Sequence, residues 1–128
     1  MKQKALRSYD DAEFLAKAGM RFDSAASRAY YALYQAIVAA LQEKKVSPGK
    51  YTDSNGKPFS RWKHEAILIA CVEVLPSQHQ WDVQDAFTLR IQADYRPEPV
   101  DPKETWRVLN AVDNLLDLLC PEPPLAEK

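Results

Sequence analysis

Cysteine and histidine are both scarce in this chain of 128 residues, which contains two of each. Cys71 and Cys120 lie far apart and form no C-x-x-C pair, so we expect two free thiols in a reducing compartment, not a disulfide framework. His64 and His79 have no neighbouring thiol or ordered acid array. The sequence therefore predicts no metal site and no cofactor.

The chain also lacks a strong net charge and a long apolar run. Its net charge of −1 at pH 7 gives no overall signature of DNA, RNA or membrane binding, although a local basic patch remains open. No apolar run approaches the ~20 residues that cross a bilayer, and the first residues do not form a secretory signal. We therefore expect a cytoplasmic protein. No phosphate-binding loop, nucleophile elbow or dinucleotide fingerprint is present.

The most informative segment runs from Ser27 to Gln42. It is rich in alanine and tyrosine and has neither glycine nor proline. Alanine favours helix because it loses no side-chain entropy when the chain becomes ordered. Large apolar side chains recur at helical spacing, at Tyr30, Leu33, Tyr34, Ile37, Val38 and Leu41. The pattern predicts a central helix from a cap at Asp23 or Ser24 to about Lys45, packed on most of its circumference.

Four other segments predict helices, which we place at about Lys4–Ala18, Arg61–Leu75, Gln78–Tyr95 and Pro102–Leu119. The expected boundary residues are Gly19 as a stop, Ser60 and Ser77 as caps, and Asp101 with Glu104 as a capping box. The apolar run Ile67–Val72 would also suit a buried strand, but a lone strand would have no partner.

These segments predict an all-α fold, an up-and-down bundle of four or five helices. We expect one domain over residues 1–120 and a disordered tail over residues 121–128. The connection Val46–Ser60 contains two prolines, two glycines and the turn signal Asn55-Gly56. It is long for a link between helices, so we expect it to be mobile or functional.

Two sequence blocks and one histidine resemble a known family when they are taken together. The blocks are Ser27–Tyr34 (SRAYYALY) and Arg90–Tyr95 (RIQADY), and His64 opens the helix between them. In this order they resemble the HEPN superfamily (higher eukaryotes and prokaryotes nucleotide-binding), most closely its small stand-alone prokaryotic members. The resemblance extends roughly from Ala5 to Leu119.

The resemblance implies a helical bundle that forms a homodimer. It also implies a partner of the minimal nucleotidyltransferase type, in a toxin–antitoxin or stress and defence setting. Active members are metal-independent RNases that use an arginine followed, after roughly four to six residues, by a histidine. Histidine can move a proton near neutral pH, and arginine can stabilise the developing charge on the phosphate.

This sequence departs from the RNase motif. The positions that would hold the histidine after Arg90 are Tyr95, Arg96 and Pro97, and only two residues separate Arg61 from His64. We therefore favour a non-catalytic domain that binds nucleotide or RNA, or that regulates a partner. Two alternatives stay open: a divergent RNase toxin that uses Arg90 with Tyr95 or His64, and a plain protein-interaction module.

The candidate binding cluster comprises Arg28, Tyr31, Arg90, Asp94 and Tyr95. Arg90 and Asp94 lie four residues apart on one helix face and can pair. Such a cluster could contact a phosphate, but we favour a structural ion pair that fixes helix register. If the pair is buried, Asp94→Ala should cost ~3–5 kcal/mol of stability.

Other candidates lie elsewhere in the sequence. His64 and Glu65 could form an acid–base pair, although a hydrogen-bonded or solvent-facing histidine is the more common case. The second candidate is a basic patch of Lys44, Lys45, Lys50, Lys57, Arg61 and Lys63. The third is a set of aromatic residues that could stack on bases but at helical spacing are more often core: Tyr30, Tyr31, Tyr34, Trp62, Trp81 and Trp106.

Overall fold

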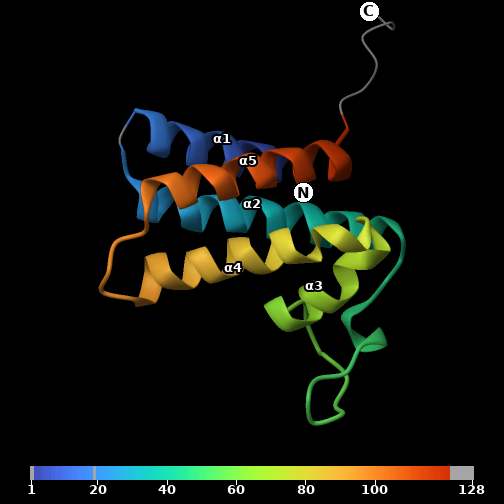
Figure 1. The fold of residues 1–128 in the computed structure, drawn as a ribbon. Coiled ribbons are helices and arrows are strands. Elements are labelled where there is room, and N and C mark those ends of the chain that lie inside the picture. Colours follow the sequence, from blue (N-terminus) through green and yellow to red (C-terminus); the bar gives the residue numbers. More distant parts are fainter. Residues whose placement is uncertain (1, 19, 122–128) are drawn as a thin grey trace, which may run out of the picture.

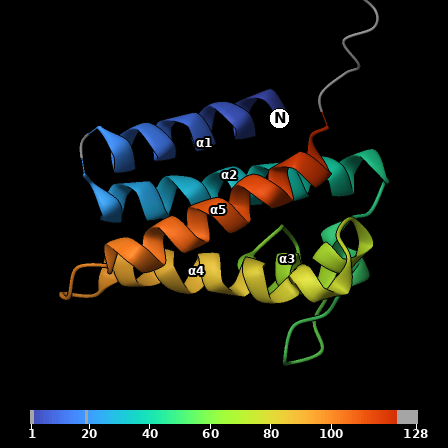
Figure 2. The same cartoon turned by 45° about the horizontal axis from the view of Figure 1, so that its top comes forward.

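The computed structural model of the chain describes residues 2–18 and 20–121, and these residues confirm the all-α class (Figure 1). They form five α-helices, namely α1 (Lys2–Lys17), α2 (Phe22–Glu43), α3 (His64–Ala70), α4 (Gln80–Tyr95) and α5 (Pro102–Leu119). The four long helices lie side by side, and the short α3 packs at one end of the bundle (Figures 1 and 2). The predicted stop at Gly19 and the tail from residue 122 onwards lie outside the described residues.

Helix α2 is the centre of the bundle, as its composition predicts. It contacts α1, α3, α4 and α5. Its Ala29, Ala32 and Ala36 are fully buried. Small side chains at these positions let the neighbouring helices approach closely. The side chains of Ser8 and Gln35 form a buried hydrogen bond of 3.1 Å that joins α1 to α2.

The start of α2 differs from the expectation. The helix begins at Phe22, and Arg21 occupies the cap position without a side-chain capping bond. Asp23 and Ser24 are therefore not caps. Instead, the Asp23 carboxylate accepts a hydrogen bond of 3.1 Å from the backbone N–H of Val100. This contact fastens the α4–α5 connection to the first turn of α2.

The third helix is shorter than predicted. A short non-helical segment precedes α3. In that segment the Trp62 carbonyl accepts a hydrogen bond of 2.8 Å from the Tyr34 hydroxyl of α2. After Ala70 the chain continues as a 3₁₀ turn, Cys71–Glu73. Among the described residues Ile67–Val72 form no strand, so the helical interpretation is confirmed.

The expected serine caps are also wrong. Lys63, not Ser60, precedes α3, and His79, not Ser77, precedes α4. Ser77 instead begins a 3₁₀ turn that leads into Gln80. Neither helix has a side-chain capping bond.

The start of α5 is where the sequence placed it, but the capping box does not form. Asp101 is the cap residue and Pro102 the first helical residue. The Asp101 carbonyl, not its carboxylate, accepts bonds of 2.9 Å from both the N–H and the hydroxyl of Thr105. The Glu104 side chain is bound by Arg107 instead.

The long connection between α2 and α3 has its own hydrogen-bonded structure. Thr52 and Pro58 form an isolated antiparallel bridge. At its tip the Asp53 carboxylate accepts backbone N–H bonds from Asn55 (2.9 Å) and Lys57 (3.0 Å). Gly56 has φ +79°, a conformation that favours glycine. The segment is therefore a short finger that projects from the bundle (Figure 1).

Among the residues that the structure describes, no helix combines the length and the apolar character that a membrane span requires. Both Cys71 and Cys120 are buried and free.

Candidate functional site

Three helices bring two of the candidate residues, His64 and Arg90, to one tyrosine. The Tyr30 hydroxyl of α2 lies 3.1 Å from Nδ1 of His64 in α3. The Arg90 guanidinium of α4 lies over the face of the Tyr30 ring, 5.6 Å from its centroid. The Phe87 ring meets Tyr30 edge-on at 5.5 Å. We call Tyr30, His64, Gln84, Phe87 and Arg90 the Tyr30 cluster.

The His64 imidazole is held on one face and at both nitrogens. Its ring stacks on Phe87, with centroids 3.5 Å apart and planes at 9°. The Tyr30 hydroxyl can donate to Nδ1, while Nε2 faces the Gln84 amide oxygen at 3.4 Å. The Gln84 amide in turn donates to the Thr88 hydroxyl at 3.1 Å. This chain of donors and acceptors fits a neutral imidazole with its proton on Nε2.

Burial is also the main reason why the pKa of His64 lies below its usual value. The nearby Arg90 charge lowers this pKa further, whereas the Gln84 hydrogen bond and the Glu65 charge act in the opposite direction. Burial likewise raises the pKa of Tyr30 to about 12, against the effect of Arg90. At neutral pH both partners of the hydrogen bond are therefore uncharged. In the described part of the chain, Glu65 makes no hydrogen bond to His64. The His64 ring is instead hydrogen-bonded to Tyr30 and Gln84, one of the two common arrangements expected for it.

Arg90 pairs with Asp94 as the four-residue spacing predicts. Its Nε lies 3.2 Å from Oδ2, and both side chains are 33% exposed. The other carboxylate oxygen accepts a hydrogen bond of 2.5 Å from the Ser27 hydroxyl of α2. The pair therefore links α2 to α4, but it is not buried. The expected cost of ~3–5 kcal/mol, which applies to buried pairs, is too high for it.

Arg28, a further residue of the expected cluster, lies near this ion pair but does not join it. Among the described residues no hydrogen bond or salt bridge joins it to Asp94, and Ser27 makes that contact instead. The Arg28 side chain is exposed and lines a shallow hollow of about 300 Å³ with Ser24, Ser27 and Asp94. It thus adds a positive charge to the edge of the Arg90–Asp94 pair.

The two other tyrosines of the predicted cluster are exposed. Tyr95 is 70% exposed at the last residue of α4. Tyr31 is 48% exposed, and its ring stacks on Tyr34 at 6.3 Å. Trp81 is 76% exposed. The expectation of a core position is therefore wrong for Tyr31 and Trp81, whereas Tyr30 is buried and Tyr34, Trp62 and Trp106 are half-buried.

Two lysines of the predicted basic patch contact one acidic residue, Glu73. Glu73 binds Lys50 at 2.5 Å and also accepts a hydrogen bond from the Tyr51 hydroxyl. Its backbone carbonyl accepts a bond of 2.6 Å from Lys44. The Lys50 hydrogen bond, then that of Tyr51, lowers the pKa of Glu73. Lys50 therefore fastens the finger to the turn after α3, and Lys44 fastens the end of α2 to the same turn.

Four cations of the patch, Lys45, Lys57, Arg61 and Lys63, remain exposed. Within residues 2–18 and 20–121 none of them has an acidic side chain at salt-bridge distance. The Arg61 charge is close enough to Tyr34 to lower its pKa slightly, although burial raises that pKa overall. Arg61 and Lys63 flank Trp62, whose carbonyl binds the Tyr34 hydroxyl, so these two cations follow the finger next to the Tyr31–Tyr34 stack.

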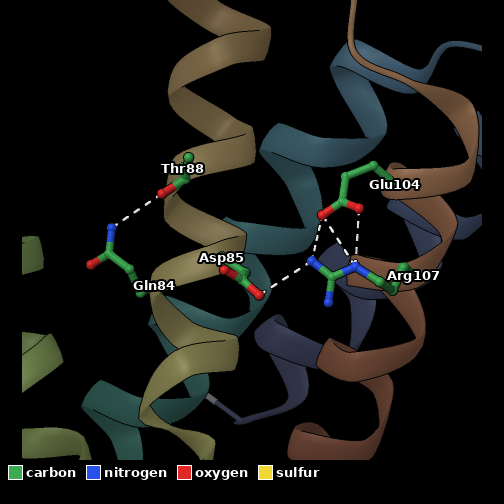
Figure 3. A network of polar contacts seen from close by, with 5 residues as sticks. All are labelled: Gln84, Asp85, Thr88, Glu104 and Arg107. Atoms are coloured by element: carbon green, nitrogen blue, oxygen red, sulfur yellow. Dashed lines mark hydrogen bonds and ion pairs between the residues drawn. The ribbon is translucent and has the colours of Figure 1, made fainter.

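A second polar network joins α4 to α5 (Figure 3). The Arg107 guanidinium of α5 binds Glu104 at 3.0 Å and Asp85 of α4 at 3.2 Å. Gln84 and Thr88 lie on a different side of α4 from Asp85 (Figure 3). Arg107 therefore fixes the flank of α4 that faces α5. No group of three or more His, Cys, Asp or Glu in the described part of the chain could hold a metal ion.

Sequence reasoning missed Gln84 and Phe87, and it treated Tyr30 only as core or as a base-stacking residue. Gln84, Phe87 and Arg90 follow one another at intervals of three, which places them along one side of a helix. That spacing was the available signal. The pairing with His64 depends on the turn before α3, which no local pattern reveals.

A comparison with protein-family models identifies the family. The model of the HEPN domain matches residues 1–122 of the chain. The chain therefore belongs to the HEPN family, as the resemblance predicted. A search of curated proteins finds no match to this chain.

Proposed function

We propose that this HEPN domain is a non-catalytic partner that binds RNA or a nucleotide. The observation that carries the proposal is the state of His64 and Arg90. Both nitrogens of His64 face protein groups and its ring is stacked on Phe87, while Arg90 is paired with Asp94. A general base must lie within reach of the proton that it removes. A side chain that binds a phosphate must carry a positive charge that no neighbouring carboxylate neutralises. Neither group meets these conditions.

The binding surface that we favour lies beside the Tyr30 cluster. It combines the exposed cations Arg61 and Lys63 with the exposed Tyr31 ring and the half-buried Tyr34 ring. Aromatic faces that stack on bases, next to cations that follow the phosphates, are typical of single-stranded nucleic acid binding. Such binding weakens as salt rises, because counterions are released from the phosphates.

A titration with a labelled single-stranded RNA tests this surface. We expect the double variant Arg61→Glu/Lys63→Glu to weaken binding and to reduce its salt dependence. The matched control is Lys103→Glu, which changes an exposed cation in the first turn of α5. Equal binding by both variants and the unchanged chain would contradict the assignment.

The alternative function is a metal-independent RNase with a divergent active site. One observation favours it, because Arg90 and His64 converge on Tyr30 from two helices. A histidine with a lowered pKa is neutral at pH 7 and is then able to accept a proton. RNA cleavage in the presence of a chelator, abolished by both Arg90→Ala and His64→Ala, would support this alternative.

The partner proteins are inferred from membership of the family, not from a contact of this chain. We propose a homodimer, and a nucleotidyltransferase-type protein as the second partner, in a toxin–antitoxin or defence setting. Co-purification of the chain with a nucleotidyltransferase encoded beside it would support this proposal. A chain that binds neither RNA, nucleotide nor such a protein would be a plain interaction module.

A further inference from the structure

A hollow of about 470 Å³ lies between α1 and α2, and we call it the α1–α2 hollow. It is lined by Lys4, Arg7, Ser8, Asp10, Asp11 and Arg28. The three cations among these residues are exposed. Across the residues described by the structure, no acidic side chain lies at salt-bridge distance from any of the three. Cations of two helices that border one hollow repel each other, and an anion between them would relieve that repulsion.

The acids of the α1–α2 hollow do not cancel its positive charge. Three cations line it against two carboxylates, and one of these carboxylates also acts towards α5. The pKa of Asp113 in α5 is raised, first by burial and then by the charges of neighbouring acids. In order of effect these acids are Asp117, Glu13 and Asp10. The acidic side of α1 therefore lies towards α5, so a polyanion is attracted to the α2 side of α1 and repelled from the α5 side.

Arg28 borders a second hollow, on the α4 side of α2. Asp23 and Asp94 line that second hollow, and among the described residues Arg28 is the one cation that lines it. The second hollow thus contains two carboxylates for one guanidinium, although Asp94 is also paired with Arg90. A phosphate that meets Arg28 therefore encounters more positive charge on the α1 side than on the α4 side.

The α1–α2 hollow continues the surface formed by the two stacked tyrosines. Arg28 and Tyr31 are exposed and lie three residues apart, which places them on one side of α2. Tyr31 stacks on Tyr34, six residues after Arg28, or about 9 Å along the helix axis. A stacked strand advances by about 3.4 Å per nucleotide, so two or three nucleotides span this distance. Cations therefore lie on both sides of an aromatic platform, with Arg61 and Lys63 on the other side.

This order of groups selects a strand over a single nucleotide. An internal nucleotide of a strand has a phosphate on each side of its base, whereas a mononucleotide carries its phosphates on one side only. Aromatic rings that stack on bases between two groups of cations match the strand.

We propose that the α1–α2 hollow is a second phosphate site, and that the ligand of this domain is single-stranded RNA and not a mononucleotide. Bases of the strand stack on Tyr31 and Tyr34. Phosphates on one side meet Arg61 and Lys63, and phosphates on the other side meet Arg28 and the cations of α1. The inference rests on the proposed function, because it extends the tyrosine surface proposed there and decides between the two ligands named there.

Titration of the full chain with labelled oligouridylates of three and eight nucleotides tests the proposal. The octamer can reach both phosphate sites, so we expect it to bind at least about tenfold more tightly than the trimer. Arg7→Gln/Arg28→Gln should abolish most of this gain. Each lost phosphate contact also removes about 0.7 from the slope of log Kd against log salt, so the slope for the octamer should fall by about 1.4.

The matched control is Lys17→Gln/Lys103→Gln. It removes two exposed cations that line neither hollow at Arg28, so the gain with length and the salt slope should both persist. Thermal melting of each variant verifies that it is folded. Uridine 5′-triphosphate tests the other source of phosphate, and we expect it to bind more than tenfold more weakly than the octamer.

The outcomes separate this inference from the proposed function. Octamer binding that responds to Arg61→Glu/Lys63→Glu but not to Arg7→Gln/Arg28→Gln would overturn the second phosphate site and leave the proposed function in place. Uridine 5′-triphosphate that binds as tightly as the octamer would overturn the choice of a strand. Failure of the two oligouridylates and of the triphosphate to bind would overturn the proposed function together with the inference.

Discussion

The Tyr30 hydroxyl lies 3.1 Å from Nδ1 of His64, and this contact joins the central helix α2 to the start of α3. Both rings also touch Phe87 of α4, so three helices meet at one polar contact inside an aromatic cluster. The contact engages Nδ1 of the imidazole with a protein group. The predictions that follow depend on it and on the ion pairs around it.

Tyr30→Phe removes the hydroxyl and leaves Nδ1 of His64 without its partner. An unsatisfied, partly buried acceptor costs about 1–2 kcal/mol, so we expect the free energy of unfolding to fall by that amount. Denaturant titration measures the change. Tyr31→Phe is the matched control, since the Tyr31 side chain is 48% exposed, and its effect should stay within about 0.5 kcal/mol. Equal effects of the two variants would show that the Tyr30–His64 bond does not stabilise the fold.

Stability should fall as the pH drops from neutral, because His64 has a lowered pKa in the folded state. The unfolded chain then binds a proton more readily than the folded chain does, near its reference pKa of about 6.5. The contribution of His64 is complete above that value and is lost as the pH falls towards the folded pKa. Protonation would also turn the Nδ1 acceptor into a donor facing Tyr30.

Denaturant titrations between neutral and mildly acid pH measure this loss. His64→Gln should flatten the pH dependence in that window, whereas His79→Gln should leave it in place. A slope that persists in the His64 variant would mean that another group is responsible. Carboxylates such as Glu104, whose pKa is lowered first by its hydrogen bond with Arg107, act only at lower pH.

Asp94→Ala breaks the bonds to Arg90 and Ser27 at once. Because the ion pair is one-third exposed, we expect a loss of about 1 kcal/mol, less than a buried pair would cost. Thermal melting of the variant should show a small shift, and Asp11→Ala, an exposed acid on α1, should show none. A loss as large as that of a buried pair would contradict the exposed geometry.

Arg107→Ala tests the network that joins α4 to α5 (Figure 3). The guanidinium is half-exposed, so we expect a cost of only about 0.5–1 kcal/mol. A double-mutant cycle with Asp85→Ala isolates the contact between the helices from the Glu104 contact within α5. A coupling energy of zero would mean that the Asp85 bond adds nothing to the packing of these helices.

The sequence predicted the helical bundle well because apolar spacing and alanine content act locally. The Arg90–Asp94 pair was predictable for the same reason, since residues four apart share a helix face. The cluster around His64 was not predictable. Its geometry depends on how the turn at Trp62 binds Tyr34, a contact between distant parts of the chain. The cap at Asp23 failed for the same reason, because its carboxylate binds the distant Val100. The capping box failed for a local reason, because Glu104 binds Arg107 within α5 instead of the helix end.

Incubation of the purified chain with single-stranded RNA in the presence of a chelator distinguishes a binding domain from a nuclease. We expect the RNA to stay intact while it binds the chain, because His64 and Arg90 are engaged by protein groups. Cleavage that yields cyclic phosphate ends and disappears in Arg90→Ala would contradict this expectation.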